Sequence, residues 1–231
     1  YRRQSRWQDV IALHQPMFAR DSSDLYSRII IAEANFYMEN FEQTRHLLLP
    51  ILNKENVPWG VFDLLGRIAL EEERYADAVG YFSGIIEKDQ RNRFGWLFLG
   101  FTYSGMDSLQ KAEANYARAL EHLPDDATIW SYYAGVQQVQ KKYDQARTSY
   151  QKALELDPYD INALSSLPII YENLGMMAQS DSLYEVALER YPESALLLNN
   201  FSYSLAERNE QMKRALEMAE KAVALEPDRP A

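Results

Sequence analysis

The sequence contains no cysteine among its 231 residues. Disulfide bonds and cysteine-based metal sites are therefore excluded within this chain. The absence does not decide the compartment, because a chain without thiols suits both cytoplasm and periplasm. The sequence also lacks any run of about 20 apolar residues, so we expect no direct insertion into a membrane.

Positive charge is scarce. Lys and Arg number 24 against 34 Asp and Glu, which gives a net charge of −10 and a pI of about 4.9. No segment is dense in Lys or Arg. Since nucleic-acid binding depends largely on neutralising phosphates, we expect no nucleic-acid partner.

Residues that carry chemistry are also few. The three histidines, His14, His46 and His122, do not lie at helix-face spacing from one another, and no glycine-rich phosphate loop occurs. Asp126 and Asp160 stand where helices are expected to begin, so we interpret them as helix caps. The sequence therefore predicts no enzyme, no metal site and no cofactor.

What the chain does contain is a helical pattern, clearest in residues 127–160. Small and large apolar residues fall three or four apart there, which places them on one face of each of two helices. The helices are expected over roughly 127–139 and 144–156. The residues that form these faces are Trp130, Tyr133, Ala134, Ala146, Tyr150, Ala153 and Leu154.

The pattern recurs every 34 residues or so. One series contains the smaller residues of this pattern: Val10, Thr44, Ala78, Ala112, Ala146 and Ser180. A second series, four residues later, is mostly large and apolar: His14, Leu48, Phe82, Tyr116, Tyr150 and Tyr184. Series that stay in phase over five steps indicate an internal repeat.

This repeat resembles the tetratricopeptide repeat, whose pattern is W-x2-L-G-x2-Y, then A-x3-F, then P. Residues 93–126 match it best, through Trp96, Leu99, Gly100, Tyr103, Ala112, Tyr116, Ala119 and Pro124. The resemblance implies an all-α, right-handed α-solenoid superhelix of helix-turn-helix units. The last repeat is similar to those common in bacterial tetratricopeptide proteins, so we expect a bacterial-type member.

The phase of the repeat divides the chain into units of one solenoid domain. We expect a partial repeat at 1–24, repeats at 25–58, 59–92, 93–126, 127–160 and 161–194, a repeat with one inserted residue at 195–229, and the start of another at 230–231. The partial first and last units suggest a fragment of a longer chain.

Three prolines fall inside expected helices. Proline removes one backbone hydrogen bond and crowds the preceding turn. We therefore expect second helices that are kinked or split at Pro16 and Pro50. We also expect Pro168 to disturb the first helix of its repeat.

In the family, first helices line a concave groove through the second, fifth, ninth and twelfth places of each repeat. In the N-terminal half these places are mostly apolar or aromatic, with one clear cation. In the C-terminal half they are smaller and polar. The resemblance implies these candidate groove residues: Tyr26, Ile29, Phe36, Arg67, Leu70, Phe94, Leu97 and Phe101.

An apolar groove suits an amphipathic helix or a hydrophobic peptide. The leading hypothesis is therefore a non-catalytic scaffold that binds a protein or peptide partner in this groove. One alternative is a self-assembling spacer that forms a homo-oligomer through open solenoid ends. Another is a regulatory repeat segment of a larger enzyme.

Overall fold

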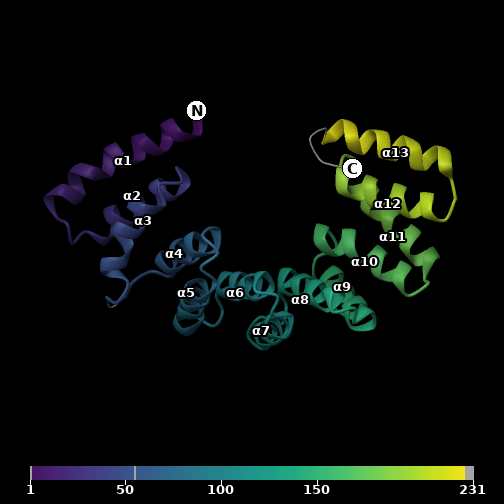
Figure 1. Cartoon of the computed structure of the whole chain (residues 1–231), viewed down its shortest axis with the longest axis horizontal. Coiled ribbons are helices and arrows are strands. Elements are labelled where there is room, and N and C mark those ends of the chain that lie inside the picture. The colour runs from purple at the N-terminus through teal and green to yellow at the C-terminus, as the bar shows by residue number, and fades with distance from the viewer. Residues whose placement is uncertain (1, 55, 227–231) are drawn as a thin grey trace. The chain divides into compact units, whose positions relative to one another are not determined.

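The computed structural model describes residues 2–54 and 56–226 of the chain. Within these residues the secondary structure is entirely helical, with no strand (Figure 1). This confirms the prediction of an all-α fold. The α-helices are α1 (Arg2–Arg20), α2 (Leu25–Tyr37), α3 (Phe41–Leu48), α4 (Trp59–Glu71), α5 (Tyr75–Lys88), α6 (Arg93–Gly105), α7 (Leu109–His122), α8 (Ala127–Val139), α9 (Tyr143–Leu156), α10 (Ile161–Asn173), α11 (Met177–Arg190), α12 (Ala195–Glu207) and α13 (Met212–Leu225).

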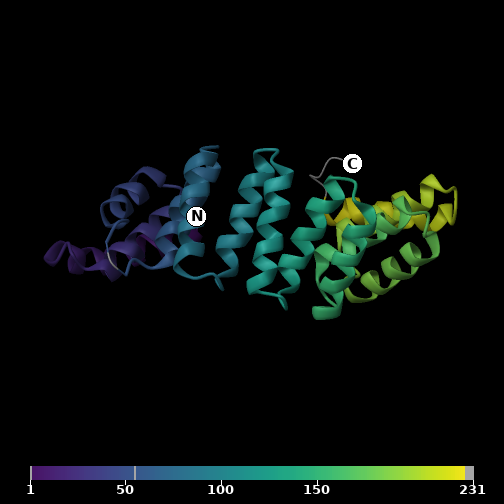
Figure 2. The same cartoon turned by 90° about the horizontal axis from the view of Figure 1, so that it is seen from below.

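The chain divides into two compact units, Tyr1–Asn115 and Tyr116–Ala231, with the boundary inside α7. Unit 1 contains α1–α6, and unit 2 contains α8–α13. Within each unit, consecutive helices pack as pairs, such as α4 with α5 and α12 with α13. Figures 1 and 2 show the two helices of a pair lying alongside each other.

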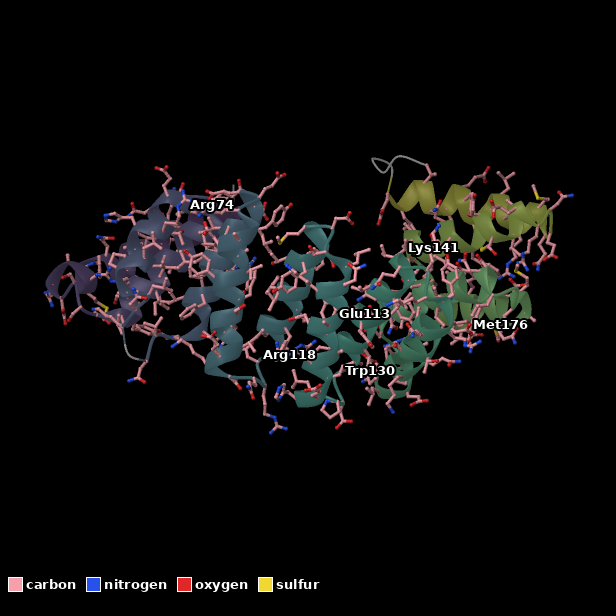
Figure 3. All side chains as sticks on the ribbon, turned by 60° about the horizontal axis from the view of Figure 1, so that its bottom comes forward. Arg74, Glu113, Arg118, Trp130, Lys141 and Met176 are labelled. Atoms are coloured by element: carbon pink, nitrogen blue, oxygen red, sulfur yellow. The ribbon has the colours of Figure 1, made fainter. Side chains whose placement is uncertain are left out.

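The turns inside the pairs share one backbone feature at a spacing of 34 residues. Each turn has a residue in the left-handed region, with φ between 53° and 73°. Lys141, labelled in Figure 3, is one of them, with φ 59°. The six residues are Glu39, Glu73, Asp107, Lys141, Gly175 and Asn209. Since glycine adopts this conformation without steric cost, Gly175 has the most favoured residue type of the six.

The helices that open a repeat are capped in a similarly periodic way. Asp126 accepts a hydrogen bond from the backbone N–H of Ile129, and Asp160 accepts one from that of Ala163. Both predicted caps are therefore confirmed. The Asp160 side chain is buried and also accepts a 2.7 Å hydrogen bond from the Ser131 hydroxyl, so it joins two successive repeats of unit 2.

The core explains why small and large residues alternate in the pattern. A Cβ added to Gly66 in α4 would come within 2.6 Å of the Phe82 ring, so only a residue without a side chain allows this approach. The Phe82 ring is fully buried and stacks on Phe98, with 5.2 Å between ring centroids. In unit 2, Tyr184 is fully buried and stacks on Phe201 at 4.8 Å.

The prolines behave differently from one another. At Pro50 the prediction is confirmed, because α3 ends at Leu48 and a short 3-10 turn, Leu49–Ile51, follows. At Pro16 a split helix is wrong, since α1 continues to Arg20. Pro16 and Ala12, whose carbonyl loses its partner, are both exposed, so water can satisfy that carbonyl.

Pro168 does not interrupt its helix either. It is buried inside α10, which runs unbroken from Ile161 to Asn173. The helix packs on both α9 and α11 and has a capped start at Asp160. Tertiary packing therefore keeps the helix continuous despite one missing backbone bond.

Candidate peptide-binding surfaces

Five large aromatic side chains are exposed on the first helices in the described part of unit 1. One of them, Tyr37, stacks on Trp7 of α1, which leaves four others. The exposed fractions are 64% for Tyr26, 40% for Trp59, 44% for Phe94 and 58% for Phe101. They come from α2, α4 and α6, and we call this set the aromatic surface. Exposed apolar side chains that gather on adjacent helices are typical of interaction sites.

Two of these residues are in direct contact. The rings of Trp59 and Phe94 stack with 5.7 Å between centroids and an interplanar angle of 11°. This contact joins α4 to α6. Trp59 is absent from the sequence-based candidates because it occupies the first place of its repeat rather than the second. The signal that could have found it is Gly60, which leaves the second place without a side chain.

Phe36 lies in a different environment from the other aromatic candidates. It is only 8% exposed and belongs to the core of unit 1. The guanidinium group of Arg67 lies 4.5 Å above its ring, which is within the range of a cation–π contact. Phe36 therefore offers little surface to a partner, and Arg67 covers it.

Arg67 is also paired with an acidic group on its own helix. Its Nη1 lies 3.7 Å from Oδ2 of Asp63. Burial raises the pKa of the Asp63 carboxyl group, and the charge of Arg67 opposes this effect. The second oxygen, Oδ1, is buried without a hydrogen-bond partner, which is an unfavourable arrangement for a carboxylate.

The three aliphatic candidates of unit 1 are half-buried. Ile29 packs against the core cluster of α2–α4, while Leu70 and Leu97 lie on α4 and α6. These side chains can contribute apolar area beside the aromatic rings. Sequence reasoning placed them on the same helix face, but their depth depends on how adjacent helices pack.

Unit 2 has a pocket of about 490 Å³ between α10 and α12, closed on one side by α11. Its polar lining consists of Glu172, Asn173, Asn199, Asn200, Tyr203 and Glu207. Ile169, Met177 and Tyr184 supply its apolar part. We call it the acidic pocket. The sequence reasoning assigned no site here.

The described residues were also compared with the requirements of a metal site and of a membrane-spanning helix. Among the described residues, no group of three or more His, Asp or Glu side chains is arranged to hold a metal ion. No helix in residues 2–54 and 56–226 combines the length and the hydropathy that a membrane-spanning segment needs.

Comparison with protein families places the repeats. A model described as "TPR repeat" matches residues 140–175, and a model described as "Tetratricopeptide repeat" matches residues 169–194. Both matches lie in unit 2. Together with the helical fold, they show that the chain contains tetratricopeptide repeats.

Solved structures agree with this fold. The chain is similar to a tetratricopeptide repeat protein from Parabacteroides merdae, with a TM-score of 0.69, 11% identity and coverage of 95% of this chain and 86% of that one. It is also similar to YrrB, described as a TPR protein with an unusual peptide-binding site, with a TM-score of 0.56, 20% identity and coverage of 82% and 93%. At these identities the likeness concerns the fold alone.

Curated relatives are much longer than this chain. The peroxisomal targeting signal receptor of Komagataella phaffii is 31% identical over 123 residues, which are 52% of this chain and 21% of that protein. Across the first four relatives, the chain spans between 6% and 21% of their length. The similarity therefore concerns the repeat segment and not the whole of those proteins.

Proposed function

We propose that this chain is a non-catalytic interaction scaffold whose aromatic surface in unit 1 binds an apolar peptide or the apolar face of an amphipathic helix. The observation that carries the proposal is the exposed stack of Trp59 on Phe94. A pair of aromatic rings exposed to water offers a large apolar area that is already ordered. A partner therefore gains burial there at little entropic cost.

The neighbouring side chains support the same kind of partner. Phe101 lies two helical turns beyond Phe94 on the same face of α6, a spacing that suits a helix or an extended strand laid across it. Leu97 stands between them on that face. The fold also supports a scaffold role, because the structurally similar YrrB is described as a TPR protein with an unusual peptide-binding site.

The test is a peptide selection on the whole chain. A random peptide library is selected on the native protein and on a Phe94→Ala/Phe101→Ala double variant. We expect the native protein to enrich peptides with aromatic or aliphatic residues three or four positions apart. Their affinity for the double variant should fall about tenfold or more, because buried aromatic contacts dominate most interfaces.

The matched control is Tyr159→Ala, which removes an aromatic side chain in unit 2 that is 55% exposed. This variant should keep the affinity of the native protein for the selected peptides. Circular dichroism should show equal helix content in all three proteins. Selected peptides that bind the double variant as tightly as the native protein would refute the assignment to the aromatic surface.

A second candidate function is self-association. The last helix, α13, exposes Leu216 to 60% and Val223 to 57%, seven residues apart and therefore on one face. A second copy of the chain could cover this face. Light scattering over a range of protein concentrations tests the idea, and a mass that stays at 26.8 kDa would refute it.

A third candidate function is regulation within a larger enzyme, in which these repeats would be one segment of a longer chain. The repeat segments of the curated relatives also form a small part of longer chains. Sequencing the complete gene decides whether a catalytic domain accompanies these repeats.

A further inference from the structure

We propose that the acidic pocket of unit 2 binds the guanidinium group of an arginine side chain in a partner peptide. The pocket has a volume of about 490 Å³. Sites for small ligands commonly measure about 300–1,000 Å³, so the pocket can enclose one long side chain. It lies wholly within unit 2, and the proposal is independent of the aromatic surface.

The charge of the pocket favours a cation. Glu172 of α10 and Glu207 of α12 both line it, and neither Lys nor Arg is among its lining residues. Arg208, which follows Glu207, is hydrogen-bonded to Asp181, since its Nη2 lies 2.6 Å and its Nη1 3.2 Å from the two carboxylate oxygens. Its charge also interacts with Glu172, but Asp181 and Glu210 offset that charge, so the region of the pocket stays negative. Two carboxylates in a partly enclosed site attract a positive group more strongly than they would in open water.

The hydrogen-bonding capacity of the pocket also favours a ligand with many donors. The hydroxyl of Tyr203 donates to Oε1 of Glu207 at 2.6 Å, and the Ser180 hydroxyl donates to Oε1 of Glu172 at 2.9 Å. The amide nitrogen of Asn173 donates to the carbonyl of Ile169 at 2.8 Å. Both hydroxyl donors and one N–H of Asn173 are therefore in use, while the second carboxylate oxygens and the Asn173 Oδ1 remain as acceptors.

Two further amides add to these acceptors. Within the described part of the chain, the side chains of Asn199 and Asn200 form no hydrogen bond with a protein group. Both belong to α12 and line the pocket, so each can offer its Oδ1 to a ligand. A cation in the pocket therefore meets the two carboxylates together with these amide oxygens, while the amide N–H groups stay available to acceptor groups of the same peptide.

Among common cationic side chains, arginine fits this arrangement better than lysine. Its planar guanidinium group carries five N–H donors and can pair with a carboxylate through two parallel hydrogen bonds. Its flat face can also stack on an aromatic ring such as that of Tyr203, which is 63% exposed. The apolar side chains of Ile169 and Met177 can pack against the methylene groups of its stem.

The test uses the whole chain and three seven-residue peptides. One has a central arginine between glycine and serine residues, and the other two have citrulline or lysine in the same place. Citrulline keeps the planar shape and most donors but carries no charge. Nuclear magnetic resonance titration should show that the arginine peptide binds about tenfold or more tightly than the citrulline peptide, with shifts at Asn199, Asn200 and Tyr203.

Substitutions in the pocket complete the test. Glu172→Gln and Glu207→Gln should each weaken binding of the arginine peptide about tenfold. Glu189→Gln, an exposed residue of α11 outside the pocket, should leave it unchanged. Circular dichroism and the dispersion of the amide spectrum verify that each variant is folded.

Several outcomes would overturn the proposal. They are equal affinity for the arginine and citrulline peptides, equal affinity for a lysine peptide, unchanged binding by both Gln variants, or no shift with the arginine peptide at millimolar concentration. None of these results affects the proposed function of unit 1, because the selection on the aromatic surface uses other residues and other peptides.

Discussion

The first helices of the two units occupy the same places in the repeat, yet their surfaces differ in chemistry. Leu97 and Asn199 both stand at the fifth place, and Leu70 and Glu172 both stand at the twelfth. Unit 1 has apolar side chains there, beside its exposed aromatic rings, whereas unit 2 surrounds its pocket with carboxylates and amides. A repeat fold therefore constrains the packing positions and leaves the surface positions free to differ between copies.

The cores of the two units, in contrast to their surfaces, are alike. Phe82 of unit 1 and Tyr184 of unit 2 are both fully buried, and each stacks on an aromatic ring of the next first helix. The same shape recurs because every repeat must fill the same space between its own two helices and the next one. The predictions below separate this shared core from the divergent surfaces.

The largest effect is expected in the core. Phe82→Ala and Tyr184→Ala should each lower the free energy of unfolding by about 3–5 kcal/mol, because each leaves a large cavity. Trp59→Ala and Tyr203→Ala, at exposed positions, should each change it by less than about 1 kcal/mol. Urea unfolding followed by circular dichroism measures all four. Equal losses for Phe82→Ala and Trp59→Ala would contradict the division between core and surface.

Salt should separate the two binding surfaces. Raising the salt concentration from about 0.05 M to about 0.5 M should lower the affinity of the acidic pocket for the arginine peptide several-fold, because screening reduces the attraction between charges. Peptides selected on the aromatic surface should bind as tightly at high salt as at low salt, or slightly more tightly, because their binding depends on the burial of apolar area and not on attraction between charges. Titrations at both salt concentrations check this, and the same salt response at both surfaces would contradict the comparison.

A smaller effect is expected in the turns. Gly175→Ala should lower the free energy of unfolding by about 1 kcal/mol, since alanine is strained at φ 73°. Glu73→Gly, at the equivalent turn of unit 1, should raise it by a similar or smaller amount, because φ is 55° there. Thermal and urea unfolding measure both changes.

A control shows whether conformation or glycine content is responsible. Gly80 lies within α5, and a Cβ added there meets no atom within 4 Å. Gly80→Ala should therefore stabilise the protein by about 0.5–1 kcal/mol. If Gly175→Ala and Gly80→Ala changed stability in the same direction, the left-handed turn would not be the cause.

The smallest effect concerns Asp63 of unit 1. Its folded pKa is raised, so the folded protein holds this proton to a higher pH than the unfolded chain does. Stability should therefore fall as the pH rises from the unfolded pKa of about 3.9 through the raised folded value. The difference in unfolding free energy between the native protein and Asp63→Asn, measured by urea unfolding at several pH values, should show this trend.

A matched control for Asp63 is Glu185→Gln in α11, because the hydrogen bond from Arg214 lowers the pKa of the Glu185 carboxyl group. The corresponding stability difference for that variant should rise with pH instead of falling. A stability difference for Asp63→Asn that stayed constant between pH 4 and pH 7 would show that burial does not perturb the Asp63 carboxyl group in solution.

Much of the helical architecture could be predicted from the spacing of residues. The expected first helix of 127–160 has the observed bounds of α8, and the second begins one residue earlier than expected, at Tyr143. These features are local, because periodic apolar residues and capping side chains act over a few positions along the chain. The continuous helices at Pro16 and Pro168 could not be predicted, since solvent exposure and packing decide whether a missing hydrogen bond breaks a helix.

The candidate site was only partly accessible to the same reasoning. The spacing indicated that Phe94 and Phe101 share a face, and the structure shows both exposed. It did not indicate that Trp59 stacks on Phe94 or that Arg67 covers Phe36, because those contacts join different helices. A repeat pattern indicates which positions are equivalent, but it does not indicate which side chains from neighbouring repeats are in contact.

The order of residues is thus sufficient for the 34-residue period, the alternation of small and large core residues, the helix caps at Asp126 and Asp160, and the net negative charge. Tertiary packing alone decides the acidic pocket, the buried oxygen of Asp63 and the stack of Trp59 on Phe94. The physical reason is the distance along the chain over which each effect acts. Periodicity and capping act within one helix, whereas burial and pocket shape arise between helices that are distant in sequence.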